Sequence, residues 1–193
     1  MLEQLKENLL AVVPFQEEEI HQIVNSFQIV TLARKEFFLQ EGEVCHRVGF
    51  LTEGVIRSFL VYEGLEKTCY LTLKNNWIAD LDSLGTGARS TKNLQALKPS
   101  TLYTIDHEDL VLLYHRFPTM ERFGRLLMEQ IAKLTIQLAT SLAIHKPEDR
   151  YKQLLHAEPD IFQEVPQKYI ANMLGMEPES LSRIRKRMAM QKA

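Results

Sequence analysis

The sequence predicts an α+β fold in three parts: an N-terminal antiparallel β-roll of the jelly-roll kind, a long helix, and a C-terminal helix-turn-helix. Three observations predict it. Short β-rich runs separated by turn residues fill the stretch from Phe27 to Asp106. An uninterrupted helical pattern then runs from about Thr119 to His145, and two short helical segments flank Gly175. We place the three parts at residues 1–117, 118–145 and 146–193.

The first 25 residues have the pattern of two helices. Leu2, Leu5 and Leu9 recur at helical spacing until Pro14 breaks the run. An acidic stretch after Gln16 opens a second, shorter helix. We therefore expect a helical segment in front of the β-rich region.

The β-rich region contains five runs of β-branched and aromatic residues. They are residues 29–32, 48–51, 55–62, 68–73 and 101–105. Turn residues separate them, at Glu41-Gly42, Glu53-Gly54, Glu63-Gly64, Asn75-Asn76 and Lys98-Pro99. Short strands at this spacing favour an antiparallel barrel or jelly roll over alternating βαβ units. A short helix over 107–116 ends before Pro118.

The long helix carries apolar residues close to a heptad repeat. The positions are Phe123, Leu127, Ile131, Leu134, Leu138 and Ser141. This spacing predicts that the helix pairs with its twin in a homodimer. The alternative is a helix that lies on its own β-roll. Leu126, Ile136 and Leu142 widen the apolar stripe, so we expect both faces to be used.

After Lys146-Pro147 the pattern predicts a helix to about His156, a linker over 158–165, and two short helices. Gly175 can adopt the left-handed conformation that ends the first of these, 167–174, and Pro178 suits the first turn of the second, 178–188. Three apolar positions in each are expected to be buried: Ile170, Ala171 and Leu174, then Leu181, Ile184 and Met188.

The second of these helices has a basic polar face, although the whole chain has a net charge of −2. No acid follows Glu179, whereas five cations do: Arg183, Arg185, Lys186, Arg187 and Lys192. Such a helix suits the major groove of DNA, where Arg183 can donate to guanine and Glu179 can accept from cytosine N4. The residues expected at phosphates are Gln167, Ser180, Ser182, Arg185, Lys186 and Arg187. Helical hairpins with a glycine turn also occur in proteins that never bind DNA.

Other classes of protein find little support in the sequence. Cys45 and Cys69 are too few for a disulfide framework or a thiolate metal site, and we expect buried, reduced thiols. No apolar run reaches the length of a membrane span, and the N-terminus lacks the pattern of a signal peptide. We find no nucleophile elbow, P-loop or zinc signature. We therefore expect a cytoplasmic protein that is not an enzyme.

Three segments resemble the Crp/Fnr family of transcription regulators. IANMLGMEPESLSRIRKRM is similar to the family's helix-turn-helix, EGEVCHRVGFLTEGVIRSF to its early β-roll, and PEDRYKQLL to the helix after its hinge. The resemblance implies a homodimer that binds double-stranded DNA and acts with RNA polymerase. It places the base-reading pair on Glu179 and Arg183. Pro178 replaces an arginine common in the family, so we expect a different operator. Family members often continue past the recognition helix into a β-wing, and because this sequence stops at Ala193 we expect a head without one.

The resemblance also implies an effector pocket, and there this chain departs from the pattern for cyclic nucleotides. Asp80 stands in place of the ribose-binding glutamate and Ala79 in place of a glycine. The arginine that neutralises the cyclic phosphate falls on Ser90, with Arg89 one place early, and a one-residue slip in a strand turns a side chain to the opposite face. Arg89 still reaches the pocket if the loop is one residue shorter than in the family. The implied pocket residues are Ile78, Ala79, Asp80, Arg89, Ser90, Thr91 and Thr135.

We therefore expect a regulator that does not bind cyclic AMP in the family's usual way. Its effector would be a small molecule or nucleotide that the sequence does not identify. Two cysteines cannot supply an iron–sulfur cluster, no histidine has partners at ligand spacing for haem, and we expect no metal site. The alternative is a module that binds a cyclic nucleotide or a small anion and carries a vestigial DNA-binding head.

Overall fold

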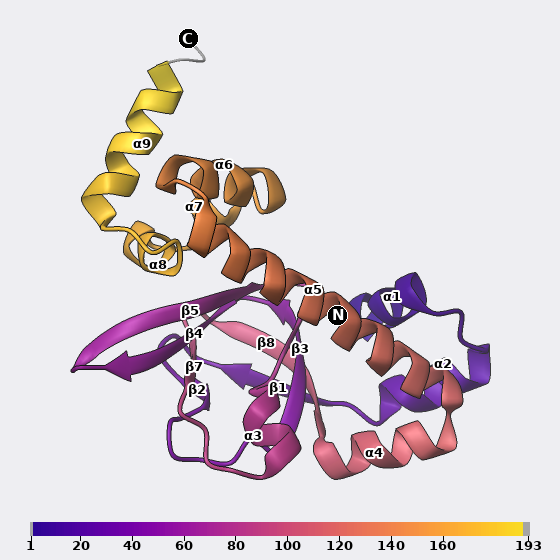
Figure 1. Cartoon of the computed structure of the whole chain (residues 1–193). Helices are drawn as coiled ribbons and strands as arrows, with labels where there is room; N and C mark the ends of the chain where they lie inside the picture. Colours follow the sequence, from indigo (N-terminus) through magenta and orange to yellow (C-terminus); the bar gives the residue numbers. More distant parts are fainter. Residues whose placement is uncertain (1, 191–193) are drawn as a thin grey trace.

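The computed structural model describes residues 2–190 and shows a β-roll, a long helix and a helical head (Figure 1). The predicted fold class is confirmed. The N-terminal helices are α1 (Leu2–Val12) and α2 (Glu17–Asn25). Strands β1 (Gln28–Leu32), β3 (Arg47–Glu53), β4 (Val55–Tyr62), β5 (Leu65–Leu73) and β8 (Ser100–Asp106) contain the five predicted runs.

The strands form two antiparallel sheets that face each other. The first has the order β1-β8-β3-β6 and the second the order β2-β7-β4-β5, with β2 (Phe37–Leu39), β6 (Asn76–Ile78) and β7 (Asn93–Ala96) as short additions. A cluster between the sheets includes Leu51, Ile56 and Leu102, all fully buried. A short helix, α3 (Leu81–Thr86), lies between β6 and β7 in the chain. The sequence did not predict these three strands or α3.

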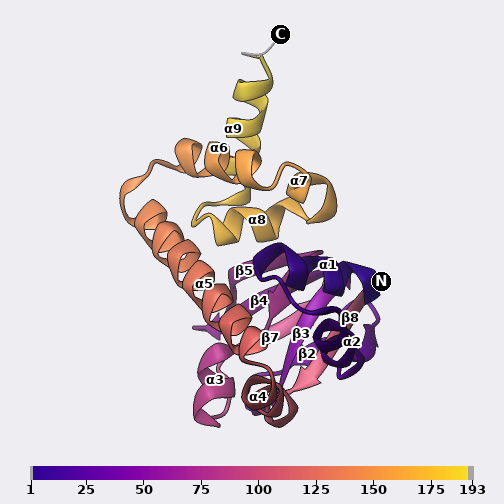
Figure 2. The same ribbon diagram turned by 90° about the vertical axis from the view of Figure 1, so that its right-hand side faces the viewer.

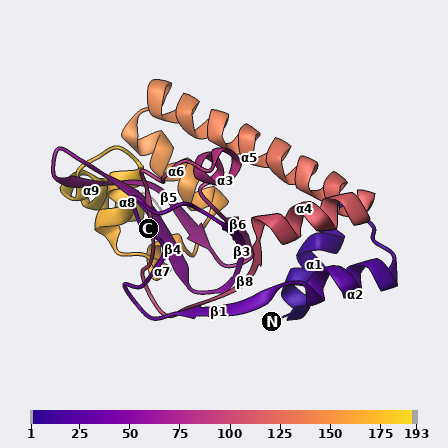
Figure 3. The same cartoon turned by 90° about the horizontal axis from the view of Figure 1, so that it is seen from below.

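Helices cover the outer side of the first sheet. Phe50, Tyr103 and Ile105 of that sheet share one apolar cluster with residues of α1, α2, α4 (His107–Arg116) and the start of α5 (Pro118–Ile144). Figure 3 shows these helices gathered at one end of the molecule. Trp77, the only tryptophan, packs there against Phe27, Phe50 and Phe123. Its fluorescence can therefore report on the folding of this domain.

Helix α5 joins the β-roll to the head (Figure 2). Its first turns are buried at Met120, Phe123 and Gly124, whereas most of its second half is exposed. The head contains α6 (Pro147–Ala157), α7 (Ile161–Glu164), α8 (Gln167–Met173) and α9 (Pro178–Met190). The predicted linker over 158–165 thus contains α7, a single helical turn. Among residues 2–190, no helix is long and apolar enough to cross a membrane.

Candidate functional site

Helices α8 and α9 form the predicted helix-turn-helix. Gly175 has a φ of 65°, the left-handed conformation that ends α8, and α9 begins at Pro178. Leu181 and Ile184 of α9 are buried at 0% and 8% exposure, against Ile170 and Ala171 of α8 in one cluster. The apolar side of α9 is therefore fixed in the head, and its polar side is left to face outward.

The exposed side of α9 carries both residues predicted to read bases and three of those predicted to contact phosphates. Glu179, Ser182, Arg183 and Lys186 are exposed, and Ser180 is half-buried. The Arg183 guanidinium donates a hydrogen bond to Ser180 Oγ at 3.3 Å. In Figure 1, α9 projects from the head with its C-terminal end away from the β-roll. Glu179 and Arg183 lie one helical turn apart on this accessible surface.

Three other predicted phosphate-binding residues make contacts inside the head. Gln167 Nε2 donates to the Pro178 carbonyl at 3.1 Å, and Arg185 Nη1 donates to Gln167 Oε1 at 3.2 Å. Arg187 forms an ion pair with Glu148 of α6. These contacts tie α9 to α8 and α6, so any role at phosphates has to be combined with a structural one. Lys192 lies outside the described residues.

The predicted effector pocket holds a closed polar cluster. Asp80 is only 3% exposed and directly precedes α3. It accepts a hydrogen bond from Ser90 Oγ at 2.7 Å and pairs with Lys92 Nζ at 2.8 Å. Lys92 was not predicted. It follows the bend at Thr91, and its backbone N–H donates to Ser90 Oγ at 3.0 Å, which brings both side chains to Asp80. Both oxygens of the Asp80 carboxylate thus have hydrogen-bond partners within the chain.

The other predicted polar residues of the pocket, Arg89, Thr91 and Thr135, are not hydrogen-bond partners of Asp80, whose partners are Ser90 and Lys92. Ile78 is buried and Ala79 half-buried, as expected for the end of a strand. Arg89 is exposed and donates to the Gly42 carbonyl at 2.7 Å, in the turn before β3. Thr91 and Thr135 are exposed, and Thr135 Oγ1 donates to the Ile131 carbonyl of its own helix. Among residues 2–190, no three His, Cys, Asp or Glu side chains gather closely enough to hold a metal ion.

The Asp80 cluster makes folding sensitive to acid. Burial raises the pKa of the Asp80 carboxyl, but hydrogen bonds from Lys92 and Ser90 outweigh this effect and leave the pKa below its ordinary value. A carboxyl whose pKa is lower in the folded state stabilises the fold above its unfolded pKa of about 3.9. That stabilisation is lost as the pH falls through the lower, folded value.

We therefore expect Asp80→Asn to reduce the free energy of unfolding by about 1–3 kcal/mol at pH 7. The difference from the unsubstituted protein should shrink as the pH falls below about 4. Urea unfolding followed by Trp77 fluorescence measures both values. Asp82→Asn, at an exposed neighbour on α3, is the control and should change the free energy by less than about 0.5 kcal/mol. A difference that persists unchanged in acid would contradict the assignment.

Helix α5 carries apolar side chains that its own chain covers only in part. The six heptad-like positions predicted above to pair with the twin helix are called the seam. Phe123 and Ser141, at its two ends, are buried within the chain, Leu127, Ile131 and Leu138 are half-buried, and Leu134 is 47% exposed. Ile136 and Ile144 are 66% and 70% exposed but lie off this seam, and Ile136, two residues from both Leu134 and Leu138, lies on the opposite side of the helix. Partly exposed leucine and isoleucine residues at heptad spacing are typical of a helix that meets another helix.

Comparisons with known proteins agree with this architecture. Residues 29–117 match the family model described as the cyclic nucleotide-binding domain. No curated protein sequence matches the chain significantly. Among solved structures, the chain is similar to FixK2 from Bradyrhizobium japonicum, with 14% identity, coverage of 86% of each chain and a TM-score of 0.76.

Two further structures have the same arrangement. A CooA mutant from Carboxydothermus hydrogenoformans is 16% identical, with coverage of 95% of this chain and 84% of that one and a TM-score of 0.70. The global regulator CLP from Xanthomonas campestris, described as responsive to c-di-GMP, is 16% identical, with coverage of 92% and 93% and a TM-score of 0.67. At these identities the likeness concerns the fold.

Proposed function

Since the chain has the fold of Crp/Fnr regulators and carries a cyclic nucleotide-binding type of domain at residues 29–117, we propose that it is a sequence-specific, DNA-binding transcription regulator. The observation that carries this proposal is the exposed side of α9. Glu179 and Arg183 are exposed on this side, and the opposite side of the helix is fixed in the head by the fully buried Leu181. The regulator acts in the cytoplasm together with RNA polymerase.

Helix α9 reads the major groove in this proposal. Arg183 donates two hydrogen bonds to a guanine, and Glu179 accepts one from a cytosine amino group. Ser180, Ser182 and Lys186 bind phosphates, as do Gln167, Arg185 and Arg187 through donors that their contacts within the head leave free. The phosphate contacts supply affinity and salt dependence, whereas the base contacts supply sequence preference.

A second copy of the chain is the partner of α5. Leu134, the most exposed position of the seam, and its half-buried neighbours Ile131 and Leu138 become covered when two such helices pair along the seam. A dimer of this kind carries two α9 helices, which engage half-sites about one turn of DNA apart on a near-palindromic operator.

The sensor domain does not bind cyclic AMP in the usual way in this proposal. A nucleotide would have to displace Lys92 and Ser90 from Asp80, and Arg89 points to the turn at Gly42. The alternative function is a module that binds a cyclic nucleotide or a small anion and has a vestigial head. A thermal-shift series with cyclic nucleotides and small anions separates the two, because a large stabilisation together with no DNA binding would favour the alternative.

We expect Arg183→Ala to weaken binding to a selected operator about 10–100-fold, because a bidentate contact to guanine contributes about 1–3 kcal/mol of discrimination. The preference at one base pair of each half-site should relax. Lys186→Ala should instead weaken binding to all sequences and lower the slope of log affinity against log salt by about one. Selection from random duplexes provides the operator, and fluorescence anisotropy measures the affinities.

Arg122→Ala is the matched control, because Arg122 is an exposed arginine near the start of α5, outside the head. It should leave operator affinity unchanged. The proposal is wrong if the unsubstituted protein shows no salt-sensitive, sequence-selective binding. The assignment of Arg183 is wrong if its variant behaves like the Arg122 variant.

A further inference from the structure

The head rests on the outer face of β4 and β5. Ile56 points into the space between the sheets, so Val55, Arg57 and Phe59 point outward by the alternation of a strand. In the strand register Val55 faces Leu73 and Arg57 faces Leu71. Val55 and Leu71 are buried in one cluster with residues of the head: Tyr151, Ile161, Val165, Ile170, Ala171, Met173, Leu174, Leu181 and Ile184.

A buried arginine stands in the middle of this apolar face. Arg57 is 2% exposed. Its Nε donates to Thr68 Oγ1 at 2.9 Å, and its Nη1 pairs with Glu66 Oε2 at 2.5 Å. Its guanidinium carbon lies 4.3 Å from the centre of the Phe59 ring and 4.1 Å from that of Tyr169. Both aromatic rings are within stacking distance of the cation, and one of them belongs to α8 of the head.

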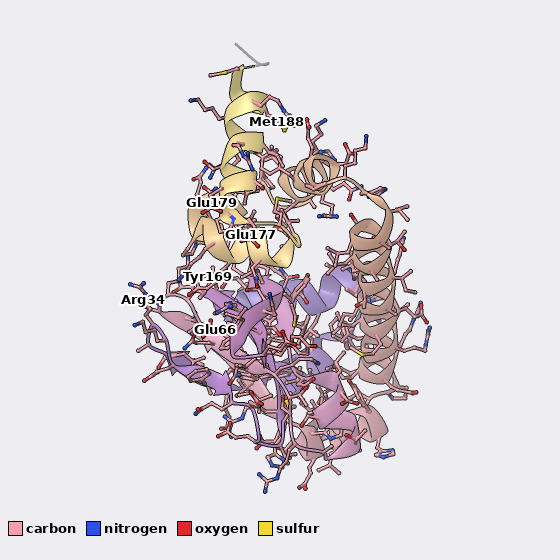
Figure 4. The ribbon with its side chains drawn as sticks, turned by 60° about the vertical axis from the view of Figure 1, so that its left-hand side comes forward. Arg34, Glu66, Tyr169, Glu177, Glu179 and Met188 are labelled. Atoms are coloured by element: carbon pink, nitrogen blue, oxygen red, sulfur yellow. The ribbon has the colours of Figure 1, made fainter. Side chains whose placement is uncertain are left out.

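Two more contacts join the β-roll to the head. The backbone N–H of Thr68 on β5 donates to Asn172 Oδ1 on α8, and Lys98 forms an ion pair with Glu164 on α7. Figure 4 shows Tyr169 at the lower edge of the head, on the side that faces the β-roll, with Glu66 on the sheet below it and Glu179 above. Helix α8 thus contacts the β-roll through Tyr169 and Asn172 while it also packs on α9.

We propose that Arg57 is a positioning residue that holds the reading head in one orientation on the β-roll and so prepares α9 for DNA. The inference rests on the proposed function. In the docked head Glu179, Ser182 and Arg183 remain exposed, so docking does not cover the reading side. A head that is already oriented loses less conformational freedom when two half-sites are engaged together.

The chemistry of the contact explains why it selects an orientation. An apolar face alone allows a packed helix to slide or rotate, because dispersion and burial have little direction. A guanidinium is planar and has fixed donor directions. Thr68 and Glu66 hold Arg57 in its plane, so the Tyr169 ring has one place in which it lies against the cation. If the head leaves, the cation loses that ring and meets water.

Tyr169→Leu tests the proposal, with Tyr169→Phe as the rescue variant that keeps the ring. We expect Tyr169→Leu to weaken operator affinity about tenfold, as loss of a desolvated cation–π contact would. The slope of log affinity against log salt should not change, because no phosphate contact is lost. Hydrogen exchange at the Thr68 amide should become faster, because Asn172 protects it only while the head is docked. Tyr169→Phe should restore both properties.

Trp77 fluorescence checks that the β-roll stays folded in each variant. If Tyr169→Leu unfolds the head, the test uses Glu66→Gln instead. The Glu66 side chain is 54% exposed and lies on the β-roll, so this substitution weakens the hold on Arg57 and leaves the head unaltered. Unchanged or tighter DNA binding by a folded variant whose Thr68 amide exchanges faster would overturn the proposal. Unchanged exchange would overturn the docking contact itself. Absence of DNA binding by the unsubstituted protein is a different result, which removes the proposed function.

Discussion

A variant carrying Leu134→Glu and Leu138→Glu is expected to be monomeric and to bind the operator at least about a hundredfold more weakly. Both positions lie on the predicted seam of α5, and Leu134 is 47% exposed in the single chain. Pairing two such helices would bring four carboxylates into an apolar contact, where unpaired charges are costly. A monomer engages one half-site at a time and loses the gain of about 10²–10⁴ that linked binding provides.

The matched control is Ala132→Glu with Ala139→Glu, which adds the same charge to the same helix. Ala132 and Ala139 are exposed and lie off the seam, each one residue after a seam position. Sedimentation equilibrium gives the oligomeric state and anisotropy gives the affinity. If the seam variant remains a dimer, or if the control dissociates equally, the twin helix does not meet α5 along this line.

The elements that the sequence predicted are those with a long enough pattern to show a period. Strand β4 has eight residues and α5 has 27, so the two-residue period of a strand and the 3.6-residue period of a helix each recur several times. Strands β2 and β6 have three residues each, too few to show alternation, and they exist because their neighbours in the sheet pair with them. The turn at Gly175 was predictable because left-handed backbone has a strong residue preference.

The functional residues were likewise predictable where a local sequence period places them, and not where a tertiary contact does. Exposure of Glu179 and Arg183 followed from the helical period of α9, since Leu181 and Ile184 fix which side is buried. The roles of Lys92 and Arg57 did not follow, because each depends on a partner that only the tertiary structure brings near. A charged residue within the apolar run of β4 was a visible signal at Arg57. Its partner Tyr169 lies on α8, more than 100 residues later in the chain, and only the packing of the head on the β-roll brings the two side chains together.

Gly54 alone connects β3 to β4, and β4 carries part of the face on which the head rests. The tight turn between the two strands depends on this glycine. Its φ is 104°, a conformation that side chains disfavour. A Cβ added there would lie 2.1 Å from Ser100 Oγ and 2.6 Å from Ser100 Cα. The second contact is with backbone at the start of β8, so a change of side-chain rotamer at Ser100 cannot relieve it.

We expect Gly54→Ala to reduce the free energy of unfolding by more than about 4 kcal/mol, the range reserved for backbone conflicts and overpacking in a core. The midpoint of thermal unfolding should fall by more than about 8 °C at this chain length, or the protein should fail to accumulate in folded form. Gly64→Ala is the matched control at the next hairpin turn. Gly64 also has a positive φ, 75°, but nothing lies within 4 Å of its added Cβ.

The control should therefore show the backbone preference alone, about 1–2 kcal/mol. Urea unfolding followed by Trp77 fluorescence compares the two variants directly. Gly54 immediately precedes Val55, which lies on the outer face of β4 and β5 where the head rests. In any folded Gly54→Ala protein we therefore expect the head to be released and hydrogen exchange at the Thr68 amide to become faster. Equal losses of stability in the two variants would show that close approach to Ser100 contributes nothing, and that only the left-handed backbone at Gly54 matters.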